Sequence, residues 1–370
     1  MFKINSESGD ARTGKLKLRS CTVNTPFFMP VGTKASVKNL SPEQLGATGT
    51  ECIIANSFIL SLKPGSKLIE EHGGIHKFMK WEKGIFTDSG GFQAGSKEFL
   101  AGITNEGIKF QNPYERKIQT LTPEDAIRIQ EELGSDVAMA LDDMPHPTAP
   151  HEVVRKSVLR THDWAKRFIK AKKDNKQLIF GISQGGIYRD LREFSAKTIN
   201  SMDFDGLAIG GLAIGETKKQ MHDALAATIV HYDKEKPRYM MGLGSPEDIL
   251  VAVENGVDCF DSIYPTQNAR RSTLLTFKGA VNYKTAKYAR DFSPIEAECN
   301  CYTCKNFTKA YVYHLLNTHE NFGLTLATIH NVRFMQRLME KIRLAVKEND
   351  YGNFRKEFLK DYKKSSIEKK

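Results

Sequence analysis

The sequence predicts an α/β protein built on a (β/α)8 TIM barrel, and three observations lead to that prediction. Eight short apolar segments recur along the 370 residues, and most of them end in a small, polar or glycine residue. Continuous apolar runs of this kind are typical of parallel strands that are buried on both faces. Segments with helical amphipathicity lie between several of the runs. Eight strands with intervening helices favour a closed barrel, with an open doubly wound sheet as the alternative.

The expected strands are short apolar runs. In chain order they are Phe28–Gly32, Cys52–Asn56, Ile85–Asp88, Val137–Asp142, Leu178–Gln184, Leu207–Gly211, Tyr239–Gly242 and Val257–Asp261. Because the carboxyl ends of all barrel strands meet at one mouth, the residues that end these runs should converge there. Among the residues at or next to those ends are Asp88, Asp142, Gln184, Gly211, Met241 and Asp261.

Helix start and stop signals lie between the strands. Thr122 is a suitable N-cap followed by a proline, and Gly134 lies beyond the end of that segment. Ser245, also followed by a proline, begins a second helix in the same way, and that helix should end near Gly256. Amphipathic helices are expected at residues 153–172 and 218–232, and a basic helix followed by a solvated tail at residues 341–370.

The charge balance favours a polyanionic partner. Lys and Arg number 54 against 44 Asp and Glu, which gives a formal net charge of +10. No apolar run approaches the roughly 18 residues of a membrane-spanning helix. The N-terminus also lacks the apolar core of a signal peptide. We therefore expect a soluble cytoplasmic protein with no membrane partner.

The run that ends at Asp88 carries the clearest sign of chemistry. Ser89 follows it, then Gly90 and Gly91, where the absence of a Cβ lets the backbone pass close to a flat ligand. A carboxylate at the tip of an inner strand is how a barrel enzyme presents a catalytic acid or base. The alternative is a turn in which the aspartate caps local amides.

Three carboxylates are expected at one mouth, namely Asp88, Asp142 and Asp261. Like charges held close together are costly unless a ligand or catalysis compensates for them. No histidine ends a strand, and no serine or cysteine lies there beside a base, which disfavours metal-dependent hydrolysis at the mouth. A carboxylate nucleophile paired with a carboxylate acid/base fits, and that pairing cleaves glycosidic bonds.

A second signal lies downstream, where three of the six cysteines fall within six residues and a histidine follows. The expected ligands are Cys299, Cys301, Cys304 and His330. In a cytosolic protein a Cys3His set favours one tetrahedral Zn2+ ion over disulfides. His314 and His319 are alternative fourth ligands. With no open coordination position, the zinc is expected to be structural, within a C-terminal helical lobe.

Five motifs then occur in a familiar order. They are Met29-Pro30-Val31-Gly32-Thr33, Thr87-Asp88-Ser89-Gly90-Gly91-Phe92-Gln93, Gly210-Gly211-Leu212-Ala213-Ile214-Gly215-Glu216, Phe260-Asp261 with Pro265-Thr266, and Cys-x-Cys-x2-Cys with Ile329-His330-Asn331. From about Ala11 to the last helix, the chain resembles the bacterial-type tRNA-guanine transglycosylases (queuine or preQ1 tRNA-ribosyltransferases). The resemblance implies a zinc-containing (β/α)8 barrel of the queuosine pathway. Such an enzyme exchanges guanine at wobble position 34 of tRNAs with GUN anticodons (Asp, Asn, His and Tyr) for a 7-deazaguanine.

The resemblance also implies roles for residues. Asp261 would be the nucleophile that holds the tRNA covalently, and Asp88 the general acid/base. The base pocket would consist of Ser89, Gly90, Gly91, Phe92, Asp142, Gln184, Gly211, Leu212 and Met241, with Phe92 and Met241 stacking on the two faces of the base. The anticodon loop would contact Gly242, Leu243, Gly244, Ser245, Pro246, Glu247, Asp248, Thr266, Gln267, Asn268, Ala269 and Arg270.

The implied organisation is a barrel with N-terminal strands at 1–290, a zinc-binding lobe at 291–345 and a basic helix and tail at 346–370, assembled as a homodimer. Where the family usually carries an arginine after Pro-Thr, this chain has Gln267. Met144 and Ile214 are bulky where queuine-accepting members are small, which favours the small base 7-aminomethyl-7-deazaguanine (preQ1). A catalytically silent RNA-binding subunit of the same fold and a carbohydrate glycosidase are the alternative functions.

Overall fold

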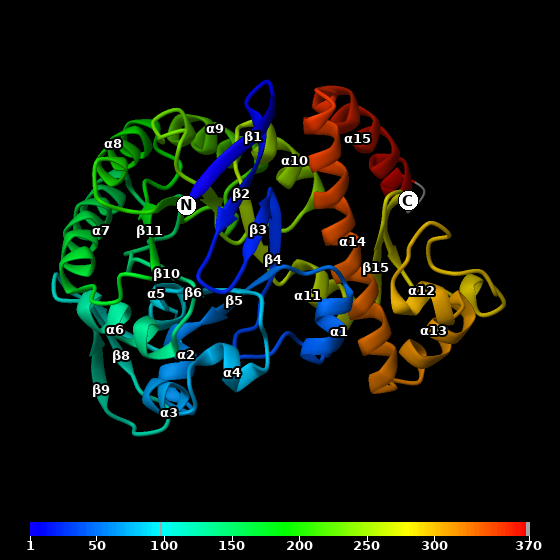
Figure 1. The fold of residues 1–370 in the computed structure, drawn as a ribbon, viewed down its shortest axis with the longest axis horizontal. Helices are drawn as coiled ribbons and strands as arrows, with labels where there is room; N and C mark the ends of the chain where they lie inside the picture. Colours follow the sequence, from blue (N-terminus) through cyan, green and yellow to red (C-terminus); the bar gives the residue numbers. More distant parts are fainter. Residues whose placement is uncertain (97, 368–370) are drawn as a thin grey trace.

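The computed structural model describes residues 1–96 and 98–367. An eight-stranded parallel sheet forms its centre, in the order β4-β14-β13-β12-β11-β10-β6-β5 (Figure 1). The two end strands meet through a parallel bridge between Val31 and Ile54, where the Gly32 amide donates to the Ile54 carbonyl at 2.7 Å. The sheet therefore closes on itself, which confirms the predicted barrel and excludes the open doubly wound sheet.

All eight expected runs are strands of this sheet. They are β4 (Phe27–Pro30), β5 (Cys52–Asn56), β6 (Gly84–Asp88), β10 (Val137–Met139), β11 (Leu178–Ser183), β12 (Gly206–Ile209), β13 (Arg238–Met240) and β14 (Cys259–Ser262). The fourth is shorter than expected, because the buried Gln130 amide bonds both backbone groups of Met139, at 2.8 Å and 3.0 Å. Asp142 consequently lies on a loop beyond the strand and not at its tip.

The barrel interior is filled by side chains. Phe86, Phe180 and Tyr239 are completely buried there and pack against one another with ring centroids 5.4 Å and 6.0 Å apart. At the amino ends of the strands, an antiparallel sheet of β1 (Phe2–Ser8), β2 (Ala11–Lys17) and β3 (Thr22–Thr25) covers this core. Leu16 and Val23 of that sheet belong to the interior cluster. One end of the barrel is thus sealed, and the mouth is the other end.

Helices surround the barrel, and the predicted caps are present. Thr122 accepts from the Asp125 amide at the start of α6 (Pro123–Leu133), and Gly134 ends that helix in the left-handed region. Ser245 caps α10 (Pro246–Glu254) in the same way. The other outer helices of the barrel are α7 (His151–Ala171), α8 (Arg189–Asn200) and α9 (Lys218–Ile229).

Smaller elements decorate the two halves of the chain. The first half adds α1 (Pro42–Ala47), α2 (Ser57–Leu62), α3 (Ser66–Glu71), α4 (Ile75–Met79), α5 (Gly91–Ala94) and the antiparallel strands β7 (Leu100–Ile103), β8 (Ile108–Gln111) and β9 (Ile118–Leu121). The second half adds α11 (Tyr264–Arg270), β15 (Thr273–Thr276), β16 (Gly279–Asn282), the 3-10 helix at Ala286–Tyr288, α12 (Tyr302–Asn306) and α13 (Lys309–Asn317).

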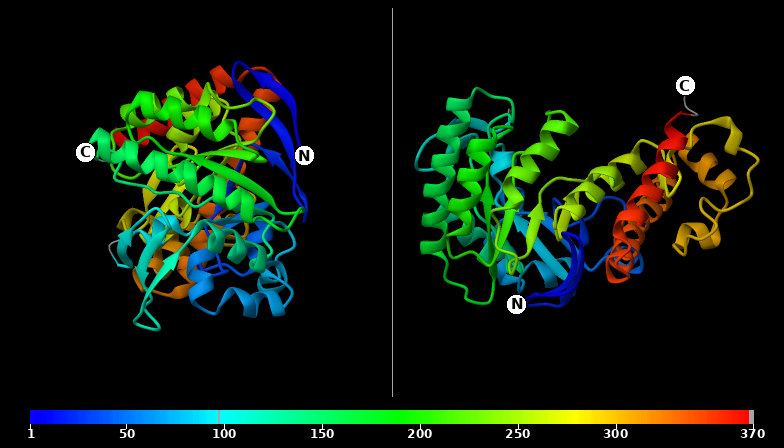
Figure 2. Two further views of the ribbon diagram at one scale, coloured as in Figure 1. Left: turned by 90° about the vertical axis from the view of Figure 1, so that its left-hand side faces the viewer. Right: turned by 90° about the horizontal axis from the view of Figure 1, so that it is seen from above.

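Two helices end the chain. The long helix α14 (Asn321–Lys347) runs between the barrel and the lobe that contains α12 and α13, and α15 (Tyr351–Ile367) follows it (Figures 1 and 2). The expectation of one helix starting at Lys341 is wrong, since that residue lies inside α14 and the break comes at Asn349, which adopts a left-handed φ of 55°. The expected tail, which begins at Asp361, continues α15 as far as Ile367, and Tyr362 within it is buried against the core, where it was expected to be solvated. The remainder of the tail, residues 368–370, lies outside the described residues.

Within the described residues, none of the helices has the length and apolar character to cross a bilayer.

Candidate active site and metal centre

The mouth of the barrel collects polar groups from several strand ends. Asp88 is the last residue of β6, and Asp261 lies within β14. Gln184 directly follows β11, Gly210 and Gly211 follow β12, and Met241 follows β13. Because all these strands are parallel in one closed sheet, their side chains share one end of the barrel.

The Asp88 carboxyl group accepts hydrogen bonds from the end of the neighbouring strand β5 and from its own turn. The Asn56 side chain donates to Oδ2 at 2.8 Å, and the amides of Ser57 and Gly90 donate to Oδ1 at 3.2 Å and 3.1 Å. Burial nonetheless raises the pKa of Asp88 to about 7, and the nearby charge of Asp261 adds to the rise, while these hydrogen bonds oppose it. A carboxyl group with such a pKa can both donate and accept a proton near neutral pH.

Asp261 has one oxygen engaged and one oxygen open. Its Oδ1 accepts from the Tyr239 hydroxyl at 2.5 Å and from the Gly242 amide at 2.7 Å. Its Oδ2 makes no hydrogen bond to any residue that the structure describes. Burial raises the pKa of Asp261, and the hydrogen bonds from Gly242 and Tyr239 lower it. The fixed geometry of Oδ1 leaves Oδ2 as the oxygen with a free lone pair.

Asp142 forms a buried polar floor with two neighbours. The Gln184 amide donates to its Oδ2 at 2.5 Å, and the Ser89 hydroxyl donates to its Oδ1 at 3.4 Å. Burial raises the pKa of Asp142 to about 6, although the Gln184 hydrogen bond opposes the rise. A Cβ on Gly91 would lie 3.0 Å from the Asp142 carbonyl oxygen, so a side chain at that turn would crowd the floor.

The loop after β12 lies against the same floor. Gly211 has a φ of +68°, and a Cβ there would lie 2.2 Å from Gln184 Oε1, so only glycine fits. Leu212 is buried, and Met241 is half-buried. The Phe92 ring is 57 % exposed, which leaves its face available to a ligand.

The two segments expected to contact RNA differ in the side chains that they expose. A cavity of about 290 Å3 lies beside the first segment, and its lining includes Gly242, Gly244 and Ser245. In the second segment, on α11, Arg270 is exposed and Gln267 and Asn268 are half-buried. Six members of the two segments are buried: Leu243, Gly244, Pro246, Asp248, Thr266 and Ala269.

Several residues of the site were not predicted from the sequence. Asn56 and Ser57 hold Asp88, and Asn56 does stand at the end of an apolar run, which was the available clue. Tyr239 looks like any other apolar strand residue, although its hydroxyl orients Asp261. Arg192 looks like part of the polar face of an amphipathic helix, yet it is completely buried behind the mouth.

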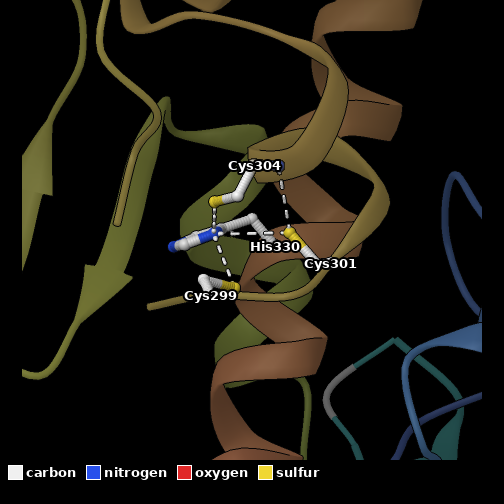
Figure 3. Close-up of side chains that lie close together, drawn as sticks. All are labelled: Cys299, Cys301, Cys304 and His330. Carbon is white, nitrogen blue, oxygen red and sulfur yellow. Dashed lines mark hydrogen bonds between the residues drawn. The ribbon is translucent and has the colours of Figure 1, made fainter. Parts of the chain in front are cut away.

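A second cluster lies in the lobe, where three cysteines surround one imidazole (Figure 3). The Nδ1 atom of His330 lies 3.3 Å from the Cys304 sulfur and 3.8 Å from the sulfurs of Cys299 and Cys301. All four ligand atoms lie within 4.8 Å of one another, and all four residues are buried. Three sulfurs and one nitrogen at this spacing suit a tetrahedral metal ion.

The surroundings of the cluster favour a metal as well. His330 Nε2 lies 2.8 Å from the Leu275 carbonyl oxygen, which turns Nδ1 toward the sulfurs. His314 and His319 are exposed and take no part in the cluster, so His330 is the histidine of the set.

The fold and the mouth define a barrel enzyme of the glycosyl-transferring class, with a buried Cys3His cluster beside the barrel. The model of the Queuine tRNA-ribosyltransferase family matches residues 6–364, and the chain belongs to this family of pentosyltransferases. It is 47 % identical to the queuine tRNA-ribosyltransferase of Bacillus subtilis (strain 168) over 353 residues, 95 % of this chain and 93 % of that protein. It is 45 % identical to the enzyme of that name from Thermotoga neapolitana over 366 residues, 99 % of each chain.

The environment of Asp88 yields a prediction about stability. Its pKa rises from an ordinary 3.8 to about 7 on folding, so its favourable contribution is present at low pH and is lost as the pH rises toward 7. Asp88→Asn does not titrate. The unfolding free energy of this variant, relative to wild type, should therefore increase by about 2 kcal/mol between pH 5 and pH 7 in urea titrations. Asp163→Asn, at an exposed position, is the control, and a pH-independent difference for Asp88→Asn would refute the raised pKa.

Proposed function

We propose that the protein is a tRNA-guanine transglycosylase that exchanges guanine 34 of GUN-anticodon tRNAs for preQ1, by double displacement through a covalent ribosyl-aspartyl intermediate. One observation carries the proposal: in a member of the queuine tRNA-ribosyltransferase family, the open Oδ2 of Asp261 shares the mouth with Asp88, whose pKa is about 7. Both carboxylates are retained, which argues against a silent RNA-binding subunit. Family membership leaves a carbohydrate glycosidase without support.

In the first displacement, Asp261 Oδ2 attacks the ribose C1′ of the nucleotide. The bond from C1′ to Oδ2 forms while the bond from C1′ to N9 breaks, and the electron pair leaves with guanine. The Gly242 amide and the Tyr239 hydroxyl hold Oδ1 still, which directs the other oxygen at the sugar. Protonated Asp88 supplies the proton that the departing base requires.

In the second displacement, the incoming base loses its N9 proton to the Asp88 carboxylate and attacks C1′. The C1′–Oδ2 bond breaks, and the Asp261 carboxylate is released. Asp88 thus donates a proton in one half-reaction and recovers it in the other, for which a pKa near the working pH is best suited. The Ser57 and Gly90 amides keep its Oδ1 in a fixed place for both transfers.

The floor of the mouth suits the guanine edge. The Asp142 carboxylate can accept from N1–H and the exocyclic amine, which is the pattern a carboxylate recognises on a base. Gln184 orients that carboxylate at 2.5 Å, and the exposed face of Phe92 and the half-buried Met241 provide stacking surfaces. Ser89, Gly90, Gly91 and the loop at Gly211–Leu212 complete the proposed pocket.

The loop after β12 favours a cationic substituent on the base. Glu216 accepts from the amides of Ala213 and Ile214, at 2.5 Å and 3.2 Å. Since a trans peptide holds its C=O opposite its N–H, the Leu212 carbonyl points away from Glu216. That carbonyl can accept from the ammonium group of preQ1. A Cβ on Gly211 would lie 3.4 Å from Met144 Cγ, so we infer that Met144 narrows the pocket on this side, whereas Ile214 is exposed.

The surface beside the mouth suits a polyanion. The chain carries a formal charge of +10, and Arg270, Arg271 and Lys278 are exposed after the nucleophile. An anticodon loop, whose bases are splayed from the helix, is the RNA element that presents a single base to such a pocket. We place the enzyme in the cytoplasm, with its substrate tRNA.

We also propose that the lobe at residues 291–345 forms the contact of a homodimer. Its surface carries an aromatic group of Tyr302, Phe307, Tyr311 and Phe322. The rings of Phe307 and Tyr311 stack with centroids 5.2 Å apart, while Tyr302 and Phe322 are 50 % and 40 % exposed. Contiguous aromatic surface of this kind is typical of protein interfaces.

The decisive experiment is the exchange of radiolabelled guanine into a tRNA with a GUN anticodon. The wild-type protein should incorporate the label and form a tRNA adduct that survives a denaturing gel. Asp261→Asn should form no adduct and should lose exchange by a factor of about a thousand or more, because the amide is not a nucleophile. An adduct trapped by the variant would remove Asp261 from that role, and a wild-type protein without exchange would refute the function itself.

The Cys3His cluster should hold one structural Zn2+ ion per subunit. His330→Ala should lose both metal and stability, because the binding free energy of a structural ion is part of the folding free energy. Elemental analysis of protein purified without chelators measures the metal, and thermal unfolding measures the stability. His314→Ala, at an exposed lobe position, is the matched control and should keep the zinc. Zinc-free wild-type protein, or loss of zinc only in the control, would contradict the assignment.

The pocket beside Met144 should select the small base. We expect efficient incorporation of preQ1 and little of queuine, whose cyclopentenediol would have to displace packed atoms. Met144→Ala should raise queuine incorporation while leaving that of preQ1 within a few-fold of wild type, as measured by competition with labelled guanine. Comparable use of the two bases by the wild-type enzyme would overturn the preference.

A further inference from the structure

Arg192 is a buried guanidinium without a carboxylate partner among the described residues. It projects from α8 and is completely buried. Its hydrogen bonds go only to backbone carbonyl oxygens of the two loops behind the mouth. Nε donates to Gly186 at 2.7 Å, Nη1 to Gly210 at 2.9 Å and to Ser183 at 3.4 Å, and Nη2 to Gly211 at 3.4 Å. Burial of this charge is costly and lowers the pKa of Arg192, and the nearby charge of Glu216 opposes that shift without forming an ion pair.

The carbonyls that Arg192 binds fix two consecutive peptide units. Each trans peptide holds its N–H opposite its C=O, so the bonds to the Gly210 and Gly211 oxygens turn the amides of Gly211 and Leu212 away from Arg192. Since α8 lies outside the barrel (Figure 1), we infer that the two amides are directed toward the mouth. The left-handed φ of +68° at Gly211 is the conformation that brings successive N–H groups to one side.

The two amides are free to bind a ligand. Neither the Gly211 N–H nor the Leu212 N–H donates to any group in the described part of the chain. They lie beside Gln184, whose side chain amide is already engaged by Asp142. Adjacent donors with no internal partner at a pocket floor require an acceptor. Guanine offers its C6 oxygen on the same edge as the groups that Asp142 would read.

We propose that Arg192 is a positioning residue for base selection, which acts by aiming the Gly211 and Leu212 amides at the C6 oxygen of the base. The inference rests on the proposed function of the mouth. An arginine suits the task because its planar fork reaches carbonyls of two different loops at once, whereas a lysine ammonium presents its donors from a single atom. Arg192→Lys keeps the charge and removes the fork.

The test compares two free bases, guanine and 6-thioguanine. The second keeps N1–H and the amine and replaces the C6 oxygen with sulfur, a weak acceptor. By calorimetry, Arg192→Lys should weaken guanine binding by about 10–100-fold, the value of two hydrogen bonds, and 6-thioguanine binding by less than about threefold. A merely structural role weakens both bases equally, and that result, or unchanged guanine binding, overturns the proposal. Arg189→Lys, on the exposed side of the same helix, is the matched control and should change neither.

Two further measurements keep the test valid if Arg192→Lys alters the fold. Arg192→Gln, which still donates to one carbonyl, should show the same selective loss of guanine binding. If both variants fail to fold, amide hydrogen exchange of the wild-type protein decides, because guanine must slow exchange at Gly211 and Leu212, and unaltered exchange there overturns the proposal. Failure of the proposed function is distinguishable, since it appears as a wild-type protein that does not incorporate labelled guanine into tRNA.

Discussion

Closure of the barrel is the constraint on which the site depends. Eight parallel strands that close on themselves must bring their carboxyl ends to one rim, and the N-terminal sheet seals the other end. Asp88 and Asp261 therefore lie together in a poorly solvated place, where burial raises the pKa of both. The fold holds them there with local donors, mostly backbone amides from neighbouring strands and turns, and not with cations. Such donors fix the carboxyl oxygens without neutralising the two carboxylates as a cation would.

The backbone of the loop after β12 depends on two residues, Gly211 and Arg192. At Gly211 the backbone crosses Gln184 so closely that a Cβ has no room, and its left-handed conformation aligns two amides. Conformational freedom alone would leave that loop loose. Arg192 restrains the loop by donating hydrogen bonds to the Gly210 and Gly211 carbonyls, which no other described side chain binds. Glycine gives this loop the conformation that it needs, and the hydrogen bonds from Arg192 hold the loop in that conformation. A preorganised pocket requires both.

Much of this could be predicted from the sequence, for identifiable reasons. The strands were predictable because buried parallel strands are continuous apolar runs, and the α6 and α10 caps because Thr122 and Ser245 precede proline. The Cys3His set was predictable from spacing alone. Tyr239 and Arg192 were not, since their roles depend on which strands become neighbours, and no local pattern encodes that. The break between the two last helices at Asn349 was not predicted, because the helical periodicity continues on both sides of it.

The Cys3His cluster and the mouth are connected by hydrogen bonds, although they belong to different parts of the fold. Asn331, the residue after His330, donates to the carbonyls of Pro265 and Thr273 at 3.1 Å and 2.9 Å and accepts from the Leu275 amide at 2.9 Å. Pro265 lies in the first turn of α11, which follows the strand that carries Asp261. A helix fixed at His330 therefore fixes the exit of β14. An ion bound at the cluster would act on the mouth through this path, by setting where the strand that carries Asp261 can end.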